Sequence, residues 1–254
     1  MRIKIAQYSL TGCEGCAVSL INALAQNLEL LNIIEIVTSR IIGHPEIKEA
    51  DIAFVDGAVV TEHDLKLLNE IRKRSKVIVA LGTCATLSGL CSLKDLYDQH
   101  ELEKHVYGIR LPIAHLDNAK PITEVIKVDY QLPGCPSFVS EIDQFMKNII
   151  LSKSFKLPEG PVCFECKAKG LPCLLDIGKT CLGPITRRGC NAQCIEYGMP
   201  CWGCRGPVDE IRIDQFLESV KKHNVDLKEL LKTMEIYLLK SNIISTIGDK
   251  LEVK

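Results

Sequence analysis

Twelve of the 13 cysteines in this chain form three groups of four, and this grouping limits what the chain can fold around. One group is spread over the amino-terminal half, and the other two are crowded together further along. The groups are Cys13, Cys16, Cys84 and Cys135; Cys163, Cys166, Cys173 and Cys181; and Cys190, Cys194, Cys201 and Cys204. Four thiolates can hold one 4Fe-4S cluster or one Zn2+. Three such sites in series would suit a protein that conducts electrons.

The composition argues against several classes of partner. With 32 acidic and 31 basic residues the net charge is -1, so the chain lacks the basic field that attracts nucleic acid or anionic lipid. The first residues, MRIKIAQYSL, contain no signal-peptide core, and no later stretch is apolar over the roughly 18 residues of a membrane span. We expect a soluble cytoplasmic protein. In a reducing cytosol this cysteine density favours metal or cluster ligation over disulfides.

Residues 1–155 are expected to form an α/β domain. Short apolar runs alternate with amphipathic stretches, as in βα units around a parallel sheet. The expected strands are residues 3–8, 33–37, 52–56, 77–81 and 126–131, and the expected helices are 17–29, 62–73 and 137–150.

The first four cysteines all follow predicted strands. Cys13 and Cys16 follow the first strand, Cys84 the fourth and Cys135 the fifth. The carboxyl ends of parallel strands share one edge of a sheet, where ligands bind. The sequence therefore predicts one shared site for these four residues.

Residues 156–254 are expected to form a second, loop-rich domain. A segment with Pro158, Gly160 and Pro161 marks the linker. Residues 161–207 contain eight cysteines, seven glycines and five prolines without helical or strand periodicity, so inorganic centres are needed to organise them. An amphipathic helical tail follows from 211 to about 239. Structural zinc is the alternative for this domain, although each tetrad has only one C-x2-C knuckle, whereas zinc ribbons pair two.

The motifs LTGCEGC, VDGAV, LGTCA and PGCP, followed by PVCFEC, GLPC, CLGPITRRGCNAQC and PCWGCRG, resemble the small, electron-transferring subunit of nickel-iron hydrogenases. The resemblance extends over nearly residues 1–207 and is to the cytoplasmic sulfhydrogenase delta subunit type. It implies a flavodoxin-like first domain whose four cysteines hold a proximal 4Fe-4S cluster. It also implies a medial cluster on Cys190, Cys194, Cys201 and Cys204, and a distal cluster on Cys163, Cys166, Cys173 and Cys181. The adjacent paired cysteines of the related quinone-linked complexes are absent, because two residues separate Cys13 from Cys16.

Two departures from the exported members of that family concern the ligands. Cys163 occupies a position where those relatives carry histidine, and Cys194 supplies a medial thiolate that they lack. More thiolate charge lowers a cluster's reduction potential. The resemblance therefore implies a large nickel-iron subunit as one partner and a low-potential partner as the other, of diaphorase-like flavin/iron-sulfur, deazaflavin-linked or bifurcating type.

Other residues near the cysteines have simpler interpretations. Cys91 is interpreted as a buried free thiol, and Asp56 as a turn residue, with a carboxylate beside the cluster or an occasional cluster ligand as the alternative. Arg187, Arg188 and Arg205 are interpreted as solvated charges, with raising a cluster's potential or docking an acidic partner as the alternatives. No residue set supports chemistry on an organic substrate, and the nucleotide-binding glycine motifs are absent. The rival functions are a relay whose large partner lacks nickel-iron chemistry and a zinc-stabilised interaction protein.

Overall fold

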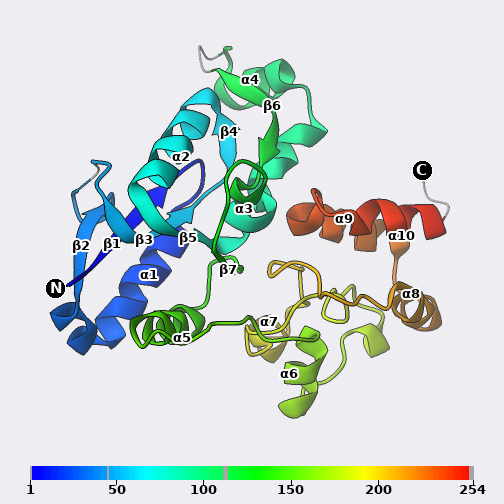
Figure 1. Ribbon diagram of the computed structural model, residues 1–254. Coiled ribbons are helices and arrows are strands. Elements are labelled where there is room, and N and C mark those ends of the chain that lie inside the picture. The colour runs from blue at the N-terminus through cyan, green and yellow to red at the C-terminus, as the bar shows by residue number, and fades with distance from the viewer. Residues whose placement is uncertain (1, 45, 111–113, 252–254) are drawn as a thin grey trace. The chain divides into compact units, whose positions relative to one another are not determined.

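A five-stranded parallel sheet organises the amino-terminal part of the chain (Figure 1). Its strands are β1 (Ile3–Ser9), β2 (Ile34–Ser39), β3 (Ala50–Asp56), β5 (Ser75–Leu81) and β7 (Tyr130–Leu132), in the order β2-β1-β3-β5-β7. This computed structural model describes residues 2–44, 46–110 and 114–251. The chain divides into two units, Met1–Phe155 and Lys156–Lys254. The predicted α/β fold with a parallel sheet is confirmed.

The last strand of this sheet is shorter than the sequence indicates. The apolar pattern predicts a strand over residues 126–131, yet β7 begins at Tyr130. Ile126 and Val128 pack against the core from an irregular segment, so their apolar character reflects burial rather than strand structure. A small antiparallel pair, β4 (Val59–Thr61) and β6 (His115–Lys120), is an addition that the sequence interpretation missed.

Alternating side chains of the strands build two apolar layers, one on each face of the sheet. On one face, Tyr8 pairs in register with Val55 and belongs to the same cluster as Leu68 and Ile71 of helix α2 (Glu62–Arg74). On strand β3 the preceding residue, Phe54, points to the other face and packs edge-on against Phe145 of helix α5 (Val139–Ile150), with ring centroids 5.8 Å apart. Period-two alternation thus buries both faces, as a covered parallel sheet requires.

The remaining elements of this unit connect the strands. They are α1 (Gly15–Gln26), η1 (Leu28–Asn32), α3 (Gly82–Leu87), η2 (Gly89–Leu96), α4 (Gln99–Tyr107) and η3 (Ile122–Glu124). Helix α1 begins after the short loop that follows β1, and α3 begins directly after β5, so residues in their first turns lie at the carboxyl edge of the sheet.

The second unit has short helices and long loops in its cysteine-rich part and longer helices after it (Figure 1). The elements are α6 (Val162–Ala168), η4 (Leu175–Ile177), α7 (Gln193–Glu196), α8 (Ile213–Lys222), α9 (Leu227–Leu238) and α10 (Ile243–Leu251). The amphipathic tail forms two helices because Asp226 caps α9, its carboxylate accepting the Lys228 amide at 2.8 Å. Among the described residues, no helix combines the length and the apolar character needed to cross a bilayer.

Candidate cysteine sites

The first cysteine group lies on the connections that leave the carboxyl ends of β1, β5 and β7. Cys16 is in the first turn of α1, Cys84 is in α3, and Cys13 and Cys135 are in the adjoining loops. The sheet order places β2 on one side of β1 and β3 on the other, so a topological switch point lies at this edge. The sheet topology therefore agrees with the strand-end placement that the sequence predicts.

Several contacts bring this group together around Cys16. The backbone at Gly82 has a φ of +88°, and a Cβ there would overlap the Cys16 sulfur, so only glycine suits the position. The Ser137 hydroxyl lies 3.9 Å from the same sulfur while donating to the Leu132 carbonyl at 2.7 Å. The Thr83 amide donates to the Gly134 carbonyl at 3.0 Å, joining the loops that precede Cys84 and Cys135. Three separate connections are thus held at one place.

Burial raises the pKa of the Cys16 thiol to about 12, and the nearby Asp56 carboxylate adds to the rise. A thiol with so high a pKa holds its proton at neutral pH, and coordination to a metal removes it. Asp56 itself is 4% exposed, and burial raises the pKa of its carboxyl to about 6. Its Oδ1 has no hydrogen-bond partner. Asp56 is therefore a buried carboxylate beside the site, which corrects its interpretation as a turn residue.

The thirteenth cysteine also lies at this site. Cys91, on η2, is half-buried; its Sγ donates to the Thr11 carbonyl at 3.3 Å, and its thiol interacts with that of Cys84. The sequence interpretation of Cys91 as a buried free thiol missed this proximity. The spacing of seven residues from Cys84 gave no signal, because the turn at Ser88, which has a φ of 64°, brings η2 back against α3.

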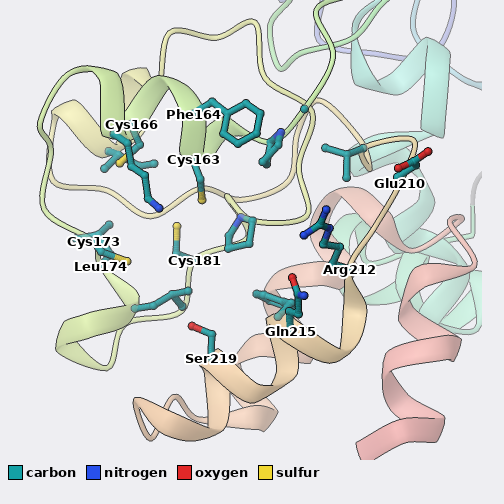
Figure 2. A pocket seen from close by; sticks show the side chains of 18 of the residues that line it. Cys163, Phe164, Cys166, Cys173, Leu174, Cys181, Glu210, Arg212, Gln215 and Ser219 are labelled. Carbon is teal, nitrogen blue, oxygen red and sulfur yellow. The ribbon is translucent and has the colours of Figure 1, made fainter.

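The second unit contains a cavity of about 860 Å3 around the Cys163 group (Figure 2). Cys163 and Cys166 come from α6, and Cys173 and Cys181 come from the loops that follow. All four line the cavity, with Arg212, Gln215 and Ser219, at the start of α8 and along it, on another wall. Burial raises the pKa of the Cys163 thiol to about 12, and the thiols of Cys181, Cys166 and Cys173 raise it further. These four cysteines therefore face one another across a common space.

A glycine again lies against the sulfurs of this group. A Cβ on Gly183 would lie 3.4 Å from the Cys163 sulfur and 3.5 Å from the Cys181 sulfur. The backbone therefore approaches both thiols closely, as it does where amide groups surround a bulky inorganic centre. The cavity is far larger than one zinc ion needs. Four thiols that line one space, those of Cys166 and Cys181 buried and that of Cys173 exposed, fit the ligand set of a 4Fe-4S cluster.

The third group lies on α7 and the loops at either side of it. Cys190 and Cys194 interact electrostatically, as do Cys201 and Cys204. Cys201 is 7% exposed, and burial raises the pKa of its thiol well above the ordinary value. Within the described part of the chain, no three His, Cys, Asp or Glu side chains are gathered as a ready-made site for a single metal ion.

The three arginines near this group have different environments. The guanidinium of Arg187 forms an ion pair with Asp209, and that of Arg188 lies 5.9 Å from the centre of the Phe164 ring. Arg205 is 1% exposed. The interpretation of Arg205 as a solvated charge is therefore wrong. Local sequence could not reveal this burial, because the exposure of a side chain is set by the folded chain and not by its charge or its sequence neighbours.

Comparisons with known proteins identify similar chains. The family model of the NADH ubiquinone oxidoreductase 20 Kd subunit matches residues 13–149. The chain is 36% identical over 222 residues to the sulfhydrogenase 2 subunit delta of Pyrococcus furiosus, covering 87% of this chain and 93% of that protein. It is 37% identical over 241 residues to a vhu subunit of the F420-non-reducing hydrogenase of Methanocaldococcus jannaschii, covering 83% and 84% of the two chains.

Solved structures are similar as well. A chain of an NAD+-reducing [NiFe]-hydrogenase in the H2-reduced state superposes with a TM-score of 0.58 at 28% identity, covering 62% of this chain and 96% of the other. A chain of the [NiFeSe] hydrogenase from Desulfovibrio vulgaris Hildenborough has a TM-score of 0.52 at 18% identity and covers 82% and 94%. The second likeness concerns the fold alone.

Proposed function

Because this chain belongs to the NADH ubiquinone oxidoreductase 20 Kd subunit family, within its nickel-iron hydrogenase small subunits, we propose that it relays electrons through three 4Fe-4S clusters. Electrons would pass between the hydrogen site of a separate large subunit and a redox partner subunit. The observation that carries the proposal is the grouping of twelve cysteines into three tetrads, one at a sheet edge and two in the second unit.

We assign one cluster to each tetrad. The proximal ligands would be Cys13, Cys16, Cys84 and Cys135; the medial ligands Cys190, Cys194, Cys201 and Cys204; and the distal ligands Cys163, Cys166, Cys173 and Cys181. Support for the distal set comes from the cavity that all four of its members line. Support for the proximal set comes from the strand ends and from the absence of a side chain at Gly82 beside Cys16.

When bound, 4Fe-4S clusters supply one-electron reduction and oxidation at low potential. The chain's own residues bind and orient them. The sheet edge presents thiols from three connections, so the position of the proximal ligands depends on the rigid strands rather than on one flexible loop. Burial shields Cys181 and Cys201 from solvent. The hydrogen chemistry itself belongs to the large subunit.

The electron partner is proposed from the ligand types. Cys163 and Cys194 complete tetrads of thiolates, whose negative charge favours low potentials. Such clusters suit a soluble cytoplasmic complex whose partner is a diaphorase-like flavin/iron-sulfur, deazaflavin-linked or bifurcating subunit.

The test is anaerobic purification of the intact complex, followed by assays of iron, acid-labile sulfide, zinc and the accompanying subunits. Three clusters predict about twelve iron and twelve sulfide per chain. Zinc without sulfide would contradict the cluster proposal and favour a zinc-stabilised interaction protein. Hydrogen-dependent dye reduction that disappears when the large subunit is removed is also expected. Iron and sulfide without that activity would favour a relay whose large partner lacks nickel-iron chemistry.

A further inference from the structure

Glu165 lies between the two cysteines that α6 contributes to the proposed distal site. These cysteines, Cys163 and Cys166, are three residues apart, so they share one face of the helix, and both line the cavity (Figure 2). Glu165 is two residues after the first and one before the second, which places its side chain on a different face of α6. A carboxylate is therefore attached to the distal cysteine pair without facing the space that the distal cysteines share.

The Glu165 carboxylate accepts backbone amides on both sides of Cys190, the first of the proposed medial ligands. Its Oε1 accepts the Gly189 amide at 2.8 Å, and its Oε2 accepts the Ala192 amide at 3.2 Å. The same Oε2 lies 3.8 Å from the Cys190 sulfur. Both carboxylate oxygens thus contact the loop of residues 189–192, which follows Glu165 in sequence by 24 to 27 residues.

The backbone of this loop adopts conformations that need support. Gly189, Asn191 and Ala192 have φ values of 119°, 55° and 49°. Glycine and asparagine tolerate positive φ, but in alanine the Cβ then crowds a carbonyl oxygen. Ala192 also precedes α7 as its N-cap residue, and its side chain forms no capping hydrogen bond. Such a conformation persists only where surrounding contacts hold it, and the Glu165 carboxylate supplies two of them.

The segment that enters the loop is also attached to the start of α6. The Val162 amide donates to the Thr186 carbonyl at 2.9 Å, and the Arg188 amide donates to the Gly160 carbonyl at 2.9 Å. These bonds align residues 186–188 with the start of the helix. Glu165 continues the connection past Cys190 to the first residue of the α7 cap.

We propose that Glu165 is a positioning residue for the medial cluster: its carboxylate, carried by the helix of the distal cysteine pair, holds the loop of residues 189–192 in the conformation in which Cys190 is a ligand. The inference rests on the proposed medial and distal sites. The medial site accordingly depends on α6, whereas the distal site does not depend on the loop. Hydrogen bonds from amides to a carboxylate are stronger than those to neutral acceptors, which suits a contact that must hold a costly backbone conformation.

Hydrogen-deuterium exchange of the intact, anaerobically purified complex tests the hydrogen bonds directly. Mass spectrometry of peptides that cover residues 187–193 measures the exchange. In Glu165→Ala two amides lose their acceptor, so their exchange should be about tenfold faster or more. Glu165→Gln keeps the side-chain length and one acceptor oxygen, so it should protect at least one of the two amides. Unchanged exchange in Glu165→Ala would overturn the inference.

Cluster content is the second measurement, made by iron assay and electron paramagnetic resonance. The medial signal is identified by its loss in Cys194→Ala, and the distal signal by its loss in Cys173→Ala. Glu165→Ala should lose medial signal, and up to about four irons per chain, while it keeps the distal signal. Glu165→Asp keeps the charge but is one methylene shorter, so it should resemble Glu165→Ala, and Glu165→Gln should keep more medial signal than either. The reverse order of the Asp and Gln variants would show that charge matters rather than reach, and would overturn the inference.

Glu196→Gln is the matched control. Glu196 also connects the end of α6 to α7, through an ion pair with Lys169 at 2.7 Å, but its side chain is 47% exposed. Its replacement should leave the medial signal and the exchange of residues 187–193 close to the wild type. Equal losses in Glu165→Ala and Glu196→Gln would show that any link between the two helices has the same effect, and would overturn the inference.

Failure of the inference differs measurably from failure of the proposed function. Joint loss of the medial and distal signals in Glu165→Ala would mean that Glu165 supports the distal cysteine pair itself, which overturns the inference. An intact medial signal in Glu165→Ala, with about twelve irons per wild-type chain, would overturn the inference alone. A wild-type chain with about eight irons and no signal sensitive to Cys194→Ala would contradict the medial cluster of the proposed function, and the inference with it.

Discussion

The backbone amide of Cys201 donates a hydrogen bond to the sulfur of Cys181 at 3.4 Å. The carbonyl of Cys201 in turn accepts the amide of Leu182 at 2.9 Å. In the proposed assignment Cys181 is a distal ligand and Cys201 a medial ligand, so these two hydrogen bonds would link the two ligand sets. Cys181 and Cys201 are 6% and 7% exposed, so electrons moving between clusters at these positions would pass through the protein interior.

The absence of a side chain at Gly82 predicts a specific loss of the proximal cluster. In Gly82→Ala the new Cβ overlaps the Cys16 sulfur, so Cys16 must move out of the tetrad. We expect about four fewer iron atoms per chain, measured by iron and sulfide assays. Gly43→Ala is the matched control: its φ of +89° is nearly the same, but nothing lies within 4 Å of the added Cβ. It should lose about 1 kcal/mol of stability and keep its full iron content. Equal iron contents in the two variants would contradict the prediction.

The neighbouring thiols Cys84 and Cys91 are predicted to have different roles. Cys84 belongs to the proposed proximal tetrad, whereas the Cys91 thiol donates to the Thr11 carbonyl beside it. Cys84→Ala should lose about four irons per chain, and Cys91→Ala should keep about twelve. Electron paramagnetic resonance of the reduced complexes measures which signal disappears. Loss of the proximal signal in Cys91→Ala alone would show that Cys91, rather than Cys84, is the ligand.

The Asp64 carboxylate connects the amino-terminal cap of α2, at Thr61, to the loop that leads from β1 to Cys13. Its Oδ2 accepts the Thr11 hydroxyl at 2.8 Å and the Thr61 amide at 2.9 Å, and the side chain is 5% exposed. Asp64→Ala should lower the free energy of unfolding by about 2–3 kcal/mol, because buried donors lose their acceptor. Urea denaturation under anaerobic conditions measures the change. Asp98→Ala, which removes an exposed cap of α4, is the control and should cost less. Equal losses would contradict a special role for the buried carboxylate.

The ion pair of Asp51 with Lys76 predicts a pH-dependent contribution to stability. The hydrogen bond from the Lys76 ammonium, 2.7 Å away, and that from the Lys4 amide lower the pKa of the Asp51 carboxyl below 3.8. A lowered pKa stabilises the folded chain at neutral pH, and this contribution disappears as the pH falls through the folded-state value. Asp51→Asn should therefore be modestly less stable at pH 7 and approach the wild type below pH 3.8.

Denaturation of wild type, Asp51→Asn and Lys76→Met at several pH values measures this contribution. Lys76→Met should show the same dependence in weaker form, because the Lys4 amide still reaches the carboxylate. A constant difference between wild type and Asp51→Asn across the acid range would refute the assignment. High salt should reduce the share of this stability contribution that comes from the exposed Asp51–Lys76 ion pair.

Much of the sheet was predictable because its strands are buried on both faces. The apolar runs of β3 and β5 are continuous and that of β1 is interrupted only by Lys4 and Gln7, and the three strands agree with the predicted residues 52–56, 77–81 and 3–8 to within about two residues. Strand β6 was missed because its sequence, His115–Lys120, is largely polar and exposed. Strand β6 forms because it pairs with β4, so its strand structure depends on a contact in the folded chain and not on the strand propensity of its own residues.

The sequence by itself determined the number and grouping of the cysteines and placed the first four at one sheet edge, because parallel strands end on the same side. It also indicated where the loop-rich segment begins, through Pro158, Gly160 and Pro161. Only the tertiary structure decided that Cys91 lies against Cys84 and that Arg205 is buried. Burial and proximity depend on residues brought together from distant parts of the chain, and no local pattern of charge or spacing contains that information.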